Sequence, residues 1–162
     1  MSPASLWQNA LIRTTSRAYK PCLTLTLVAL LSACSASTPD NLGLHDGRLA
    51  PCPSSPNCVS SQASGEHFIE PLPLKGTAAE TQKHLKHLLV SVPRMSLVTE
   101  KPGYIHAEYT TRLMRFIDDL EFVIGESAVE LRSASRLGHS DLGANRARIE
   151  ELRQRWQAQP AH

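Results

Sequence analysis

The sequence lacks a long apolar run, and it is poor in aromatic residues. A membrane-spanning helix needs about 20 consecutive apolar residues, whereas the apolar segment of this chain, Leu23 to Leu31, is much shorter. Phe, Tyr and Trp number only three, three and two. So few aromatic side chains leave little material for an apolar ligand cavity beyond what the core requires. The composition therefore argues against a transmembrane protein and against a large apolar cavity.

The chain also lacks an excess of charge once its first segment is set aside. Of its 17 Lys and Arg residues, three (Arg13, Arg17 and Lys20) lie in residues 1–33, which carry no Asp or Glu. The remaining 14 basic residues face 15 acidic ones, which is a formal charge of −1. The positive charge that attracts nucleic acid is thus absent from the rest of the chain, and we expect no nucleic-acid partner.

The first 33 residues have the layout of a secretory signal peptide. Basic residues precede the short apolar segment, and small residues lead to a cysteine in the motif Leu31-Ser32-Ala33-Cys34. A membrane-spanning or buried core helix over residues 21–31 is the alternative interpretation, and the short apolar run disfavours it. The motif resembles the lipobox of bacterial lipoprotein signals.

This resemblance implies a lipid-anchored protein of the cell envelope. Residues 1–33 would be removed and Cys34 would carry the lipid that attaches the protein to a membrane. Residues 34–50, which are rich in Ser, Thr, Pro, Asp, Asn and Gly, would form a flexible tether. By analogy with other lipoproteins, Ser35 favours the outer membrane, with the protein facing the periplasm.

The two remaining cysteines, Cys52 and Cys58, are predicted to form a disulfide. Exported proteins meet an oxidising compartment, in which nearby cysteines pair. Closing a seven-residue loop stabilises a fold by roughly 2 to 2.5 kcal/mol. A metal pair or a redox-active dithiol are the alternatives, but the spacing does not match Cys-x-x-Cys and no second pair completes a zinc site.

Residues 51–158 are predicted to form a single globular α+β domain. Thr77 and Glu80 have capping-box spacing at the start of a helix that Pro93 ends. The predicted strands are Met95–Thr99, Tyr104–Thr111, Phe116–Ile124 and Ala128–Ser135, and a last helix runs from about Leu142 to Gln157. Phe68-Ile69 is a further candidate edge strand. We expect a two-layer sandwich: an antiparallel sheet of four to five strands with two helices packed on one face.

Strand alternation assigns the two faces of this sheet. Apolar residues such as Ile105, Leu120 and Phe122 share the face that meets the helices. The opposite face is predicted to be polar and open to partners, with His106, Glu108, Asp119, Glu121, Glu130 and Arg132 on it. The last helix is predicted to place Leu142, Ile149, Leu152 and Trp156 on its apolar side.

Three ordered blocks carry a resemblance to a known family. They are residues 47–61, 116–122 and 132–146. Together they resemble DUF1499, a family known only as a domain of unknown function, and with the stretches between them they cover nearly all of the predicted domain. The resemblance implies no activity, substrate or catalytic residue.

The block from Arg132 to Arg148 holds the candidate site for an anion or a partner. The candidate residues are Arg132, Arg136, Ser140, Asp141 and Arg146. A helix N-terminus attracts anions, so a small anionic ligand or an envelope protein is one interpretation. The other is architectural: Asp141 caps the last helix while the arginines pair with Asp118, Asp119 or Glu121.

Other chemistry is less well supported. An envelope hydrolase using Ser133 to Asp141 is the alternative function, with Ser135, His139 and Ser140 as its residues. Triads normally assemble from separated segments, however, and no Gly-x-Ser-x-Gly motif is present. The acidic pattern around Asp119 lacks the loop of a calcium site. We expect no catalytic residue, metal or cofactor.

A periplasmic carrier of a small amphipathic ligand is a further alternative. It requires a cavity lined by Leu85, Leu89, Tyr109 and Phe122. The leading prediction is instead a lipid-anchored, non-enzymatic binding or interaction module of the envelope. Its polar sheet face and its arginine-rich turn would meet a partner protein or a small anionic ligand.

Overall fold

Four long antiparallel strands form the centre of the sheet in the computed structural model, which describes residues 37–159. They are β5 (Met95–Lys101), β6 (Tyr104–Thr110), β7 (Ile117–Ile124) and β8 (Ala128–Ser135). Their order in the sheet follows the order in the chain, because a short connection joins each strand to the next. All four are predicted from alternation, with ends that differ by two residues at most. The α+β class is confirmed.

The predicted count of four to five strands is wrong. The sheet has six strands, because β3 (Cys58–Ser60) and β4 (Leu72–Pro73) both pair with β8 along its outer edge. A separate two-stranded sheet joins β1 (Leu44–His45) to β2 (Arg48–Leu49). Strands of two or three residues are too short for alternation to reveal. The candidate edge strand at Phe68 is only a single bridge to Ser60.

Both helices pack on the apolar face of the sheet. They are α2 (Ala78–Ser91) and α3 (Ala144–Ala158), and a short 3-10 helix, η1 (Gly65–His67), follows β3. The predicted capping box is confirmed, since the Thr77 hydroxyl accepts the Glu80 N–H and the Glu80 carboxylate accepts the Thr77 N–H. The helices and the sheet enclose one core. Its largest buried members include Leu85, Leu89, Phe122, Leu131, Ile149 and Trp156.

Helix α3 begins later than the sequence predicts. Leu142 and Gly143 both have left-handed backbones, with φ of 55° and 79°, and this keeps Leu142 out of the helix. The predicted place of Leu142 on the apolar side of α3 is therefore wrong, because its side chain is 96% exposed. The Asp141 carboxylate still caps the helix from outside, since it accepts the N–H groups of Gly143 and Asn145.

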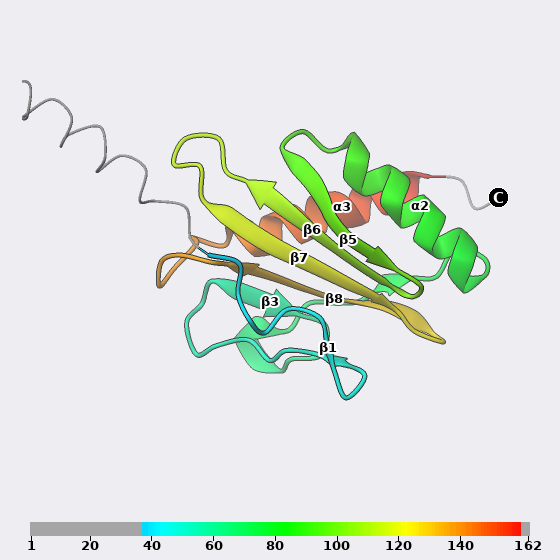
Figure 1. The fold of residues 1–162 in the computed structure, drawn as a ribbon, viewed down its shortest axis with the longest axis horizontal. Helices are drawn as coiled ribbons and strands as arrows, with labels where there is room; N and C mark the ends of the chain where they lie inside the picture. Colours follow the sequence, from blue (N-terminus) through cyan, green and yellow to red (C-terminus); the bar gives the residue numbers. More distant parts are fainter. Residues whose placement is uncertain (1–36, 160–162) are drawn as a thin grey trace, which may run out of the picture. The chain divides into compact units, whose positions relative to one another are not determined.

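The polar face of the sheet is covered rather than open. An N-terminal segment, residues 37–53, crosses it on the side opposite the helices (Figure 1). His106, Asp119, Glu121 and Arg132 are buried beneath this segment. The prediction of an exposed polar face is thus wrong for these residues, because alternation shows which residues share a face and not what lies over it. The structure also differs from the predicted tether between Leu44 and Ala50, where the chain forms β1 and β2.

The predicted signal peptide, residues 1–33, and the predicted lipid attachment site, Cys34, lie outside the described residues. Between residues 37 and 159, the two helices are too short and too polar for either to cross a lipid bilayer.

Candidate functional site

Beneath the N-terminal segment lies a charged cluster on the polar sheet face: His106, Glu108, Asp119, Glu121, Arg132 and Arg136. Asp119 is at its centre. Its Oδ1 accepts a hydrogen bond from Nε2 of His106 at 2.8 Å. Arg136 donates to both oxygens of Asp119, with Nε 2.8 Å from Oδ2 and a terminal nitrogen 2.7 Å from Oδ1. Burial raises the pKa of the Asp119 carboxyl, but the bonds from Arg136 and His106 outweigh it, so that pKa is lowered.

Glu121 forms the second half of the charged cluster. It is fully buried and accepts hydrogen bonds from the Tyr104 hydroxyl at 2.8 Å, from the Gly43 N–H at 2.7 Å and from Arg132 at 3.2 Å. Burial, followed by the charge of Glu121, raises the pKa of Tyr104, so the phenol stays protonated as a donor. The bond from Gly43 ties the N-terminal segment directly to the sheet.

Some nitrogen and oxygen atoms of the charged cluster could act as metal ligands, but the guanidinium of Arg136 already bonds to the carboxylates among them. Ligand atoms of His106, Glu108 and Asp119 lie within 4.8 Å of one another. Arg136 donates to the carboxylates of Glu108 and Asp119, and its hydrogen bond to Asp119 raises the pKa of Arg136. A cation here would have to displace this guanidinium. Arg136 therefore supplies the positive charge that a metal ion would bring.

The candidate residues of the arginine-rich block separate into two places. Arg132 and Arg136 belong to the charged cluster, where they pair with Glu121 and Asp119. Ser140 and Asp141 lie in the turn before α3, and Arg146 donates to the backbone carbonyl of Glu66. The arrangement is the architectural one for most of these residues: Asp141 caps α3, and Arg132 and Arg136 pair with carboxylates, whereas Arg146 does not.

The residues of the hydrolase alternative do not assemble into a triad. The hydroxyl groups of Ser133 and Ser135 both bond to the side chain of Asn145. His139 is exposed and has no hydrogen-bond partner within residues 37–159. Of the four residues of the carrier alternative, Leu85, Leu89 and Phe122 are fully buried members of the core and line no open cavity of the described chain. The fourth, Tyr109, is partly buried and packs against Arg148.

Asn145 is a structural residue that the sequence analysis missed, whereas Arg148 belongs to the arginine-rich block and pairs with an acidic residue as the architectural interpretation expects. Asn145 is buried and bonds to Ser133, Ser135, Asp141 and Arg148, and to the backbone carbonyl of Asn57. Arg148 pairs with Asp118 at 2.6 Å and lies over the ring of Tyr109, 4.1 Å from its centroid. Nothing in the spacing of the sequence distinguishes this amide from other polar residues of the block.

The predicted disulfide between Cys52 and Cys58 is confirmed. It joins the end of the N-terminal segment to the start of β3, and Cys52 lines two pockets. One pocket, of about 360 Å³, opens over the charged cluster and is lined by Pro39, Arg132 and Arg136 among others. Nε of Arg132 is buried without a hydrogen-bond partner among the described residues.

The other pocket, which we name the hairpin pocket, lies between the β1–β2 hairpin and the β3–η1 region and has a volume of about 710 Å³. Its basic side chains are His45, Arg48 and His67, and its apolar lining includes Leu49 and Ala63. No Asp or Glu lines this pocket. Arg48 makes no ion pair or hydrogen bond through its guanidinium within the described part of the chain, whereas most other arginines there are paired.

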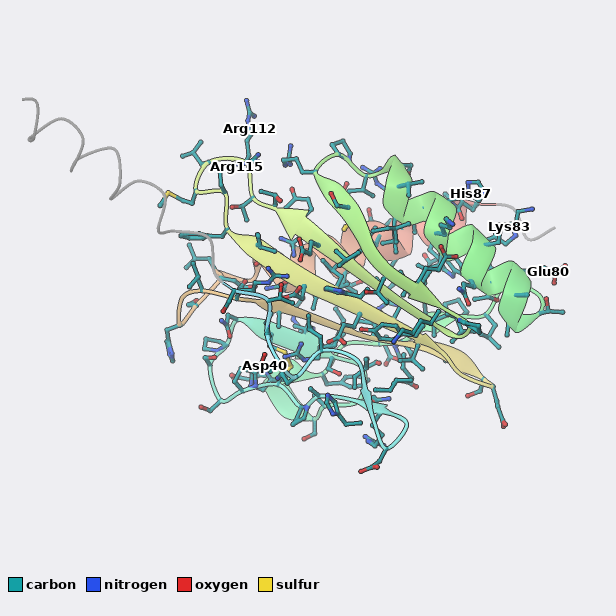
Figure 2. All side chains as sticks on the ribbon, viewed as in Figure 1. Asp40, Glu80, Lys83, His87, Arg112 and Arg115 are labelled. Carbon is teal, nitrogen blue, oxygen red and sulfur yellow. A yellow bond between two sulfur atoms is a disulfide. The ribbon has the colours of Figure 1, made fainter. Side chains whose placement is uncertain are left out.

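The hairpin pocket is absent from the sequence analysis, because its residues come from separate short segments. A second pocket of about 710 Å³ lies between α2 and β5, but its acidic residue, Glu100, already pairs with Lys86 at 2.7 Å. Lys83 and His87, which also line it, lie on the outer side of α2 (Figure 2).

Comparison with known proteins identifies a family but no function. A family model described as "Protein of unknown function (DUF1499)" matches residues 48–156. This range includes Arg48, β3, the central sheet and nearly all of α3. None of the curated proteins matches the chain.

Proposed function

We propose a role for this chain, which belongs to the DUF1499 family, as a lipid-anchored, non-enzymatic binding module of the cell envelope. Its ligand would be a small anion with an apolar part, held in the hairpin pocket. The anchor would be a lipid on Cys34, with the protein on the outer membrane facing the periplasm.

The observation that carries the binding role is the charge of the hairpin pocket. One arginine, Arg48, and two histidines, His45 and His67, line a concavity that contains no carboxylate. An arginine with no partner is a strong recognition element, because its planar fork matches a carboxylate or a phosphate. Apolar residues beside it favour a ligand with an anionic group and a hydrocarbon part.

The backbone of the hairpin pocket is held in shape by several bonds. The Leu49 N–H donates to the Gln62 side chain at 3.0 Å, and His67 Nδ1 lies 2.9 Å from the Cys58 carbonyl. The disulfide fixes Cys52 to the same region. A preformed pocket of this kind loses little conformational entropy when a ligand binds.

The envelope location is supported by the sequence and by the disulfide. The lipobox-like motif Leu31-Ser32-Ala33-Cys34 follows a short apolar segment, and Ser35 follows the cysteine. Disulfides such as Cys52–Cys58 persist in oxidising compartments and are rare in the cytosol. Together these features agree with export and lipid attachment.

The binding role is tested by calorimetric titration of the full, oxidised chain with inorganic phosphate and with decyl phosphate. We expect decyl phosphate to bind more tightly, and Arg48→Gln to weaken it by about tenfold to a hundredfold, the usual value of a charged hydrogen bond. The control is Arg155→Gln, because Arg155 is on α3 and pairs with Glu151. Equal losses in both variants, or no binding to the unaltered chain, would contradict the proposal.

The anchor is tested separately by mass spectrometry of the protein purified from bacterial membranes. We expect the mature chain to begin at Cys34 and to carry the added mass of a lipid. A Cys34→Ser chain should lose this mass and leave the membrane fraction. An unmodified Cys34 in the membrane-purified protein would contradict the proposed anchor without affecting the ligand test.

A further inference from the structure

Two loops and the start of the described chain meet at one end of the sheet, which we call the loop end. β6 and β7 pair through Thr110 and Ile117, so the connection over residues 111–116 leaves from this end. The β8–α3 connection, residues 136–143, leaves beside it, since Asp118 pairs with Ser135. Pro39 lines one pocket together with Ser135, the last residue of β8. Figure 1 shows both connections and the start of the cyan chain at this same end.

The loop end carries the most exposed large apolar side chains of the described residues. Leu142 is 96% exposed, Leu113 is 86% exposed and Met114 is 64% exposed. Single exposed apolar residues are ordinary on a protein surface. Here three of them, together with Leu137, lie in two loops that leave the same end of the sheet, and several exposed apolar side chains at one end of a protein are typical of an interaction surface.

Two arginines flank the apolar tip of the β6–β7 connection. Arg112 and Arg115 enclose Leu113-Met114, and Figure 2 shows Arg112 directed away from the body of the protein. Neither arginine has an ion-pair partner within residues 37–159. The one acidic residue of these two loops, Asp141, uses its carboxylate to cap α3. The loop end therefore combines apolar tips with unpaired positive charge.

The backbone of both loops is strained at these same positions. Arg115 and Leu142 have φ of 57° and 55°, a left-handed conformation that side chains other than Gly, Asn and Asp rarely adopt. The exposed side chain of Leu142 gains no burial from this conformation. Strain of this kind gathers at functional positions.

The described chain begins at the loop end, a few residues after the proposed anchor in the sequence. Ser37 is the first described residue and follows Cys34 by three residues, a span of at most about 11 Å when fully extended. The chain packs on the sheet soon afterwards, through Pro39 and Gly43. A lipid on Cys34 would therefore hold the loop end close to the membrane.

From these observations we infer that the loop end rests on an anionic lipid membrane, with Leu113, Met114 and Leu142 entering the interface and Arg112 and Arg115 meeting lipid headgroups. The inference rests on the proposed lipid anchor at Cys34 for its orientation. Apolar tips beside basic residues are the composition of surfaces that lie in the membrane interface. The hairpin pocket lies beside the two-stranded sheet rather than among these loop tips, so it would stay open to a ligand.

The orientation can be measured by tryptophan quenching in the full chain. Leu113→Trp places a reporter in the loop end, and Ser127→Trp places one in the exposed β7–β8 turn at the opposite end of the sheet. Each chain is reconstituted in vesicles of brominated phosphatidylglycerol, with the unaltered chain as the baseline for its own tryptophans. We expect quenching of Leu113→Trp and no added quenching of Ser127→Trp.

The outcomes separate this inference from the proposed anchor. If mass spectrometry finds the lipid on Cys34 and the two reporters behave alike, the anchor stands and the membrane-resting orientation is overturned; a protein would then be the remaining occupant of the loop end. If Cys34 carries no lipid, the proposed anchor is wrong. Quenching of Leu113→Trp and Ser127→Trp is then measured after vesicles are added to the unacylated chains. Selective quenching there still supports the surface, and its absence overturns it.

Charge gives a second readout. In phosphatidylglycerol vesicles, some chains have the loop end in contact with the membrane and others do not. We expect Arg112→Gln and Arg115→Gln each to lower the ratio of the first to the second by about fivefold. In phosphatidylcholine vesicles the same variants should have little effect, because the headgroups carry no net charge. An equal loss in both kinds of vesicle would contradict the role given to the arginines.

Discussion

The guanidinium of Arg136 donates two hydrogen bonds to the carboxylate of Asp119, 2.8 Å from Nε to Oδ2 and 2.7 Å from a terminal nitrogen to Oδ1. Both side chains are almost completely shielded from water. The pair lies on the sheet face that alternation predicts to be open. Its neighbours His106 and Glu108 complete a buried network of opposite charges. The stability of the fold should therefore depend on each partner being present.

Arg136→Gln is expected to lower the free energy of unfolding by about 3–5 kcal/mol, because it leaves the charge of Asp119 buried without its partner. Urea unfolding of the oxidised chain measures this loss. The control is Glu151→Gln, which breaks an exposed pair with Arg155 and should cost about 0–1 kcal/mol. Similar small losses in both variants would mean that the Arg136 pair is solvated.

The lowered pKa of Asp119 should make the stability depend on pH. The unfolded carboxyl titrates near 3.8, and a group whose pKa is lower in the folded state stabilises the fold fully above that value. The contribution is lost as the pH falls through the folded pKa. We expect the free energy of unfolding to decline below about pH 4, as measured by urea unfolding at a series of pH values. Asp119→Asn should show a shallower decline, and an unchanged decline would assign the acid sensitivity to other carboxylates.

The disulfide is expected to hold the N-terminal segment over the charged cluster. Replacing Cys52 and Cys58 by serine should lower the free energy of unfolding by about 2 to 2.5 kcal/mol on the chain-entropy estimate. It should also speed hydrogen exchange at the Gly43 amide, which donates to Glu121 beneath the segment. A reductant should reproduce both effects in the unaltered chain and add nothing in the double variant. Unchanged exchange at Gly43 would show that the segment needs no disulfide.

Asn145 should prove to be a structural residue despite its place in the arginine-rich block. Its side chain bonds to β8 through Ser133 and Ser135, to the turn through Asp141, and to the Asn57 carbonyl. Asn145→Ala leaves several buried groups unsatisfied, so we expect a loss of about 3 kcal/mol in urea unfolding. His139→Ala, an exposed residue of the same block, should change stability by less than about 0.5 kcal/mol. A larger loss in the His139 variant would contradict this assignment.

The long elements of the fold were predictable and the short ones were not. β6, β7 and β8 have alternating polar and apolar residues over seven or eight positions. The Thr77–Glu80 pair marks the start of α2, so local sequence patterns are enough to predict these elements. β3 and β4 form only because β8 offers them an edge. The N-terminal segment over the charged cluster was unpredictable for the same reason. The polar composition of residues 37–50 is that of a flexible tether, and the segment is ordered only because it packs on the sheet.

The candidate site divides in the same way. The pairing of Arg132 with Glu121 follows from strand register, which places these two residues opposite each other. Arg136 comes two residues after Ala134, the register partner of Asp119, and so lies near that carboxylate. The hairpin pocket does not follow from register, because Arg48 and His67 come from separate short segments. A single sequence carries no signal that these two side chains share a concavity.

Leu142 provides the sharpest test of the loop end, because stability and membrane contact should move in opposite directions. Its left-handed backbone costs about 1–2 kcal/mol for a leucine, and glycine removes most of that cost while adding some freedom to the unfolded chain. Leu142→Gly should therefore raise the free energy of unfolding by about 0.5–1 kcal/mol, as measured by urea unfolding.

In a chain that also carries Leu113→Trp, the same substitution should reduce quenching by brominated lipid, because one apolar tip is lost from the interface. Val90→Gly, which changes an exposed residue in the last turn of α2, is the control and should lower stability while leaving the quenching unchanged. If Leu142→Gly destabilised the fold, the side chain would have a packing role that its exposure contradicts. If it stabilised the fold and left the quenching intact, the strain at Leu142 would have no connection with the membrane.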